Sequence, residues 1–71
     1  MLILSQDKKH LINLDNVNNI DVIIGKVVCY FHNTMVPQEI GEYDTEDRAK
    51  KILEKIQIAS INCPYYDMPK E

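Results

Sequence analysis

The stretch Glu42–Ser60 constrains the fold more than any other part of this 71-residue sequence, because it alone shows clear helical periodicity. Its apolar residues form one stripe at helical spacing, made of Ala49, Ile52, Leu53, Ile56 and Ala59. Asp44 or Thr45 can cap the first turn, since a short side-chain oxygen accepts a hydrogen bond from a backbone N–H there. We therefore predict a helix over residues 44–60 that must cover an apolar surface formed by other residues.

The preceding residues, 1–43, have the pattern of short β-strands separated by turns. Apolar and β-branched runs alternate with stretches rich in Asn, Asp and Gly, and strands are expected at 1–5, 10–14, 20–24, 27–32 and 38–43. The sequence thus predicts a single α+β domain over residues 1–71. Its predicted architecture is a four- to five-stranded antiparallel β-meander with one C-terminal amphipathic helix packed on the sheet, followed by an extended tail over residues 61–71.

Two turns and one strand carry further expectations. Gly25-Lys26 has the length and the leading glycine of a tight II′ hairpin turn, and Asn33-Thr34-Met35 is expected to be a second turn. The run Val27–His32 between them carries bulky residues on both faces. Such a strand is central in a sheet or presents its second face, which includes Tyr30 and His32, to another chain.

The size and charge of the chain limit the classes of partner. A domain of this length buries only about 60% of its unfolded surface, so a homo-oligomer is expected. The formal net charge of −3 and the pI near 5.2 make nucleic-acid binding unlikely. Lys8, Lys9 and His10 form a local basic cluster, which we interpret as a solvated turn.

The residues needed for catalysis or metal binding are present but are not grouped in the sequence. His10 and His32 have no neighbouring nucleophile, and Cys29, His32 and Cys63 are too few ligands for zinc. We expect no enzyme activity, no metal and no cofactor. Because the start shows neither a leader nor a membrane span, we expect a cytoplasmic protein with reduced thiols.

Several aromatic and apolar residues favour a binding surface. Tyr65 and Tyr66 are adjacent and flanked by prolines, so an extended tail cannot turn both toward one core. Ile58 lies off the apolar stripe of the helix and therefore needs a neighbour. The predicted partner or oligomer contacts are Tyr30, His32, Ile58 and Met68.

Three segments resemble a family of small, mostly uncharacterised proteins carried by phages and prophages of low-GC Gram-positive bacteria. They are the opening M-L-I-L-S-Q-D-K-K-H-L-I-N-L, the junction I-G-E-Y-D-T-E-D-R-A-K-K-I-L-E-K-I-Q and the ending Y-Y-D-M-P-K-E. The family often has an aromatic residue in place of Leu2 and an arginine in place of Leu4, so a role carried by that arginine does not transfer. The resemblance implies the cytoplasm of an infected or lysogenic host and supplies no activity.

Two functional hypotheses follow. The first is a non-enzymatic, oligomeric accessory protein that counters host defence by sequestering a small nucleotide signal or by capping a host protein. Its candidate ligand-binding residues are Ser5, Gln6, Asp7, Tyr43, Arg48, Tyr65 and Tyr66, with Arg48 and the tyrosines gripping or stacking on the nucleotide. The alternative is a structural or regulatory protein–protein interaction module that has no small-molecule ligand and uses a sheet edge or the tail.

Overall fold

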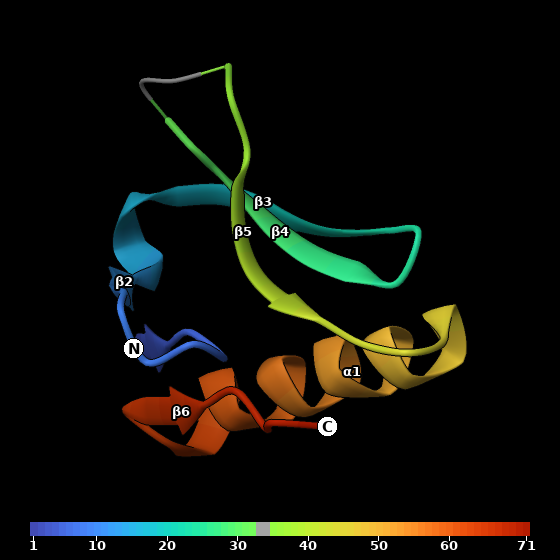
Figure 1. Cartoon of the computed structure of the whole chain (residues 1–71). Helices are drawn as coiled ribbons and strands as arrows, with labels where there is room; N and C mark the ends of the chain where they lie inside the picture. The colour runs from blue at the N-terminus through green and yellow to red at the C-terminus, as the bar shows by residue number, and fades with distance from the viewer. Residues whose placement is uncertain (33–34) are drawn as a thin grey trace.

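The part of the chain that the structure describes forms six short strands, one short 3-10 helix and one long α-helix (Figure 1). The structure is a computed structural model that describes residues 1–32 and 35–71. In chain order the elements are β1 (Leu2–Leu4), β2 (Leu11–Asn13), the 3-10 helix η1 (Leu14–Asn16), β3 (Val17–Ile23), β4 (Lys26–Phe31), β5 (Gln38–Glu42), α1 (Glu46–Asn62) and β6 (Tyr65–Asp67).

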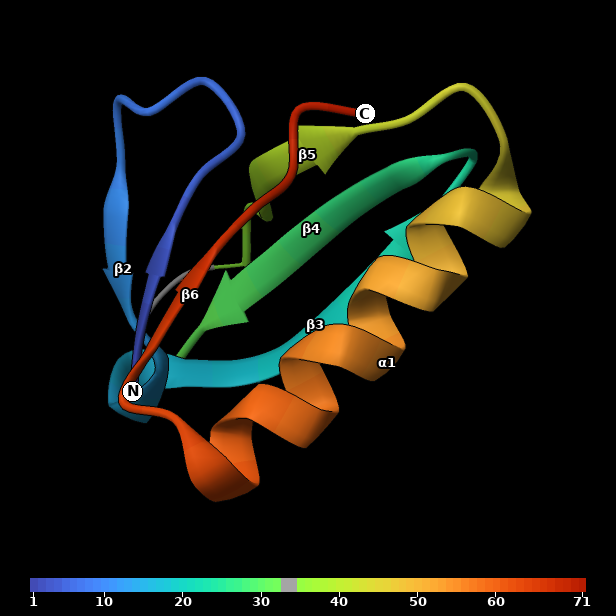
Figure 2. The same cartoon turned by 90° about the horizontal axis from the view of Figure 1, so that it is seen from below.

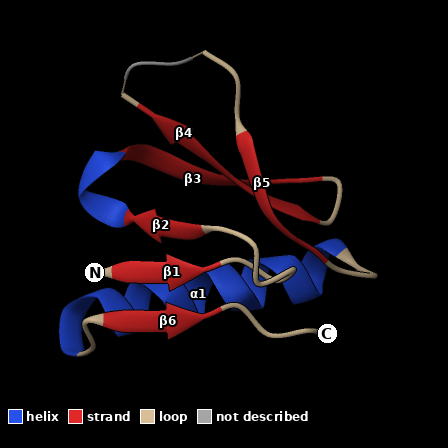
Figure 3. Cartoon of the chain, turned by 60° about the vertical axis from the view of Figure 1, so that its left-hand side comes forward, coloured by secondary structure: helices blue, strands red, loops and turns tan. Residues whose placement is uncertain are grey.

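The strands form two three-stranded sheets, in the orders β2-β1-β6 and β3-β4-β5. The first sheet is mixed, because β1 pairs antiparallel with β2 and parallel with β6, and the second is antiparallel throughout (Figure 3). The α+β class is confirmed, but the single four- to five-stranded meander is wrong. The helix η1 interrupts the meander after β2, where the Asn13 side chain accepts a hydrogen bond from the backbone N–H of Asp15 (3.0 Å).

The tail supplies the strand that the meander prediction left out. The backbone N–H of Leu2 donates to Pro64 O (2.9 Å) and that of Met68 donates to Leu4 O (3.0 Å), so β6 extends the first sheet beside β1. Pro64 and Pro69 lie just outside this strand, where their missing N–H groups interrupt no pairing inside it. The tail expected at 61–71 is therefore a strand with a short extended end, and it begins after the helix ends at Asn62.

Helix α1 packs on both sheets (Figure 2). Thr45 is its N-cap, with its hydroxyl oxygen accepting from the backbone N–H of Arg48 (3.1 Å). The predicted stripe is buried at four positions, Ala49, Ile52, Ile56 and Ala59. The helix prediction is confirmed, with its bounds moved two residues toward the C-terminus.

The β3–β4 hairpin turns one residue earlier than predicted. Ile23 pairs with Lys26, so the two loop residues are Ile24 and Gly25, and both have positive φ values, 49° and 77°. Two successive positive φ values are the requirement of a type I′ turn, which matches the twist of the strands. The predicted Gly25-Lys26 turn is therefore wrong. The other predicted turn falls at Asn33 and Thr34, which lie outside the described residues, and Met35.

The core lies between the helix and the inner faces of the two sheets. Its buried members are Ile3, Ile12, Val27, Cys29, Ile40, Tyr43, Ala49, Ile52, Ile56 and Met68. Every strand except β3 and β6 contributes a buried residue to this core, and the tail contributes Met68. The two ends of the chain are therefore part of the same apolar core.

Candidate functional site

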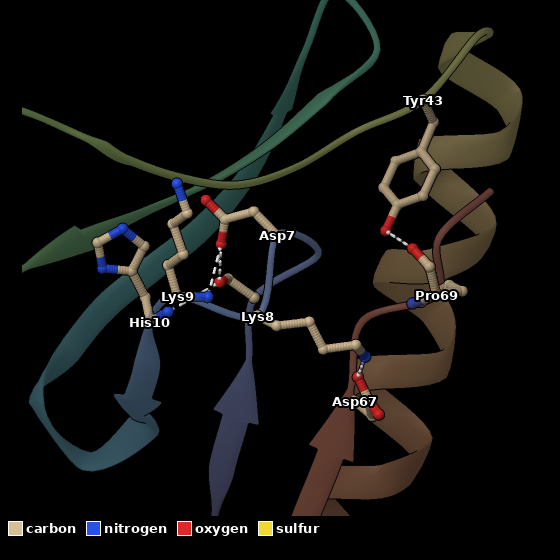
Figure 4. Close-up of polar contacts among 8 residues, drawn as sticks. Asp7, Lys8, Lys9, His10, Tyr43, Asp67 and Pro69 are labelled. Atoms are coloured by element: carbon tan, nitrogen blue, oxygen red, sulfur yellow. Dashed lines mark hydrogen bonds and ion pairs between the residues drawn. The ribbon is translucent and has the colours of Figure 1, made fainter.

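The predicted ligand-binding residues Ser5 and Asp7 form a closed turn at the end of β1 (Figure 4). Ser5 is buried, and its hydroxyl donates to Asp7 Oδ1 (2.6 Å) while accepting from the backbone N–H of His10 (3.1 Å). The same Asp7 oxygen accepts from the backbone N–H of Lys9 (2.9 Å). These hydrogen bonds, chiefly that of the Ser5 hydroxyl, lower the pKa of the Asp7 carboxyl. The turn explains both residues without a ligand.

Gln6, between them, joins three segments of the chain. Its side-chain oxygen accepts from the backbone N–H of Glu42 (2.7 Å), and its side-chain N–H₂ donates to Glu42 O (2.9 Å) and Lys70 O (2.7 Å). Its backbone N–H donates to Ile40 O (2.8 Å). Gln6 thus connects the first sheet to β5 of the second sheet and to the residues after β6.

Residues 67–71, here called the C-terminal strap, accept hydrogen bonds from two further predicted site residues, Tyr43 and Arg48. The Tyr43 hydroxyl donates to Pro69 O (2.8 Å), as Figure 4 shows, and the Arg48 Nε donates to Glu71 O (3.1 Å). Lys8 pairs with Asp67 (2.7 Å) on the surface. Burial raises the pKa of the Tyr43 hydroxyl to about 12.

A shallow cleft of about 330 Å³ lies beside this strap. It brings together Tyr43 and Arg48, as the nucleotide hypothesis requires, but its lining also holds the acidic residues Glu42, Asp44 and Glu71. Three carboxylates against the two cations Arg48 and Lys70 disfavour an anionic ligand. Ser5, Gln6, Asp7, Tyr65 and Tyr66 are not among its lining residues.

Tyr65 and Tyr66 point to opposite faces of the first sheet, since successive strand residues alternate. Tyr66 pairs with the buried Ile3 and packs against the core, where burial raises the pKa of its hydroxyl. Tyr65 pairs with Leu2 on the other face and is 46% exposed. The two tyrosines therefore cannot act on one ligand together.

The outer face of the first sheet carries four apolar residues, which the strand register places beside the polar Asn13 and Asp67. Residues directly opposite one another share a face, so the pairs Leu2–Tyr65 and Leu4–Leu11 lie on the same side. Leu11 is 60% exposed and Leu2 is 38% exposed. We call Leu2, Leu4, Leu11 and Tyr65 the outer apolar face.

Sequence reasoning missed the three leucines of this face. The runs Met1–Ser5 and His10–Leu14 are apolar on both faces of their strands, as is Val27–His32. We argued that Val27–His32, with apolar residues on both faces, can present one face to another chain. The same argument applies to Met1–Ser5 and His10–Leu14. That signal would have identified Leu2, Leu4 and Leu11.

The predicted partner contacts lie in three different places, the end of β4, the helix and the core. Tyr30 is half-buried near the end of β4, and the neighbouring His32 is exposed. Ile58 is 61% exposed on the helix. Met68 is 1% exposed in the core of its own chain, so it supports the strap from inside.

Neither a metal site nor a membrane span emerges from the described residues. Residues 1–32 and 35–71 contain no group of three or more His, Cys, Asp or Glu side chains placed to hold a metal ion. Within the same residues, no helix has the length and apolar character to cross a membrane. Comparison of this chain with protein-family models, curated proteins and solved structures found no match.

Proposed function

We propose that this chain is a non-enzymatic accessory binding protein that captures another protein through the outer apolar face. The observation that carries the proposal is the exposure of Leu2, Leu11 and Tyr65 together on one side of a three-stranded sheet. Contiguous exposed apolar surface on a small domain marks an interaction site more often than isolated apolar residues do. In the phage or prophage setting that the sequence resemblance implies, the partner is a host protein and the role is counter-defence.

The use of the predicted site residues supports protein capture over sequestration of a nucleotide in the cleft beside the strap. Gln6, Tyr43 and Arg48 direct their polar groups at the chain's own main chain. A ligand that bound these side chains would replace their hydrogen bonds to the main chain of the strap, and the strap would lose those bonds. A flat apolar face needs no such rearrangement to bind a protein, and aromatic and leucine side chains suit the centre of an interface.

The test compares Leu11→Lys with Ile58→Lys. The two side chains are matched in exposure, 60% and 61%, but lie on the outer apolar face and on the helix respectively. A photo-crosslinking residue placed at Asn13, next to the face, would be used to capture partners in host cells. Capture should be lost in Leu11→Lys and retained in Ile58→Lys, because a lysine at an interface centre must be desolvated.

Three results would contradict the proposal. Loss of capture in Ile58→Lys alone would move the interface to the helix, and equal capture by both variants would exclude both surfaces. A second copy of this chain could also bind the outer apolar face. Light scattering coupled to gel filtration tests this by measuring the oligomeric state. A dimer that Leu11→Lys converts to a monomer would show that the face serves the homo-oligomer instead of a host protein.

A further inference from the structure

A second hollow of about 420 Å³ lies between the edge strand β2 and the nearby ends of β4 and β5. Like the cleft beside the strap, it is shallow and open to solvent. We call it the β2 groove. Its lining consists of Lys9, His10, Asn13, Asn16, Phe31 and Gln38, together with the apolar Ile12 and with Leu11 of the outer apolar face.

The charge of the β2 groove differs from that of the cleft beside the strap. The chain as a whole carries a net charge of −3, yet no carboxylate is among the described residues that line this groove. Asp7, Asp15 and Glu39 are close to lining residues in the sequence, and the charges of His10 and Lys9 act on Asp7, whose pKa is lowered chiefly by the Ser5 hydroxyl. Asp7 Oδ1 accepts from the Ser5 hydroxyl and from the backbone N–H of Lys9, and Asp7 does not line the groove, whereas Lys9 and His10 do.

The other side chains offer the contacts that a nucleobase needs. Phe31, the last residue of β4, is half-buried and presents an aromatic ring to the groove. Asn13 uses its side-chain carbonyl oxygen to cap η1, and its N–H₂ group can serve as a donor at the groove that Asn13 lines. Gln38 donates from its Nε2 to Glu39 O (3.2 Å), which leaves its carbonyl oxygen as an acceptor. Amide side chains pair with base edges, and aromatic rings stack on base faces.

We propose that the β2 groove binds a nucleoside phosphate, with the phosphate at Lys9 and His10 and the base between Phe31 and the amides of Gln38 and Asn16. Lysine binds phosphate as a strong point charge with three donors. This site uses none of the residues that the sequence hypothesis assigned to a nucleotide. It changes the interpretation of the basic cluster from a solvated turn to one half of a binding site.

The experiment is an NMR titration of the full ¹⁵N-labelled chain with AMP. Adenosine, ribose 5-phosphate and inorganic phosphate are titrated in parallel to separate the base from the phosphate. The side-chain amide signals of Asn13, Asn16 and Gln38 report directly from the groove. We expect AMP to shift these signals, and adenosine and ribose 5-phosphate each to bind about tenfold more weakly, since each lacks a contact worth roughly one such factor.

Lys9→Gln and Lys55→Gln are the matched variants, since both lysines are exposed and Lys55 lies on α1 away from the groove. Lys9→Gln should weaken AMP binding by about tenfold and Lys55→Gln should leave it unchanged. Phe31→Leu, which keeps an apolar side chain, should weaken AMP binding while leaving ribose 5-phosphate binding unchanged.

Several outcomes would overturn the site. They are the absence of shifts in the three amide signals at millimolar AMP, an equal loss in Lys9→Gln and Lys55→Gln, and equal binding of AMP and inorganic phosphate. The last would indicate an adventitious anion only. The titration uses purified protein alone and the outer apolar face is tested by capture in cells, so either proposal can fail while the other stands.

Discussion

The side-chain amide of Gln6 pairs with the main chain of Glu42 in the way that a neighbouring strand would. Gln6 Oε1 accepts from Glu42 N at 2.7 Å and Gln6 Nε2 donates to Glu42 O at 2.9 Å. The same Nε2 reaches Lys70 O at 2.7 Å. One side chain therefore continues the hydrogen bonding of β5 and ties the strap to it, so a residue assigned to ligand binding acts as a structural connector.

Replacing Gln6 with Ala should lower the free energy of unfolding by about 1–3 kcal/mol, because three hydrogen bonds are lost at once. Urea unfolding followed by circular dichroism measures the change. Gln57→Ala is the control, since Gln57 is exposed on α1. An equal effect of the two substitutions would contradict the connecting role of Gln6.

Tyr43 should titrate with a pKa of about 12, because burial disfavours its phenolate. The folded pKa lies above the unfolded value, so the stabilisation by Tyr43 is complete below about pH 10 and is lost as the pH rises toward 12. Absorbance at 295 nm follows the ionisation. Tyr43→Phe removes this ionisation and the hydrogen bond to Pro69 O, and should lower the free energy of unfolding by about 0.5–1.5 kcal/mol.

Gly41→Ala should destabilise the strap through a steric clash. A Cβ atom at this position would lie 2.8 Å from a ring carbon of Tyr43 and 3.0 Å from the methyl carbon of Met68. Both neighbours are buried, so the collision should lower the free energy of unfolding by about 1–3 kcal/mol. Hydrogen exchange should show faster exchange at Met68 N–H than in the wild type. Unchanged exchange there would contradict the clash.

Asp7 should make the stability of the fold sensitive to acid. Its folded pKa is lowered, chiefly by the Ser5 hydroxyl, so its contribution is present above the unfolded pKa and is lost as the pH falls through the folded pKa. Asp7→Asn should therefore reduce the stability difference between pH 7 and pH 2. Thermal unfolding at the two pH values measures this difference, and an identical difference in the variant would exclude Asp7 as a source.

Arg48→Ala should loosen the end of the strap and leave the rest of the fold intact. The guanidinium contacts Glu71 O from an exposed position, so the loss should be below about 1 kcal/mol. Faster hydrogen exchange at residues 69–71, with unchanged exchange in α1, is the expected pattern. Faster exchange in α1 as well would contradict this prediction, because it would show that Arg48 stabilises more than the end of the strap.

The helix was predictable from the sequence because all its signals are local. The apolar stripe from Ala49 to Ala59 and the cap at Thr45 agree on one element, and the helix forms there. The hairpin at Ile24-Gly25 was placed one residue late, because an isoleucine at positive φ contradicts the local preference. Pairing across the two sheets overrides that preference.

The pairing of β6 with β1 could not be predicted, because it joins residues about sixty positions apart. Tyr65 and Tyr66 were correctly expected not to share one core, but nothing local identifies Leu2 and Ile3 as their partners. The candidate site was likewise predictable only in its local part. Ser5-Gln6-Asp7 stood out as polar residues, while their intramolecular partners Glu42 and Lys70 are distant in sequence.

The parallel pairing of β1 with β6 has a consequence for how the protein is made. The first strand of the chain is central in its sheet, yet one of its two neighbours is made of residues 65–67. During synthesis on the ribosome, β1 therefore cannot pair with β6 until almost all of the described chain has been made. The first sheet of this domain is therefore complete only after residues 65–67 have left the ribosome, and a translation that stops before Tyr65 releases a chain whose first strand lacks its partner.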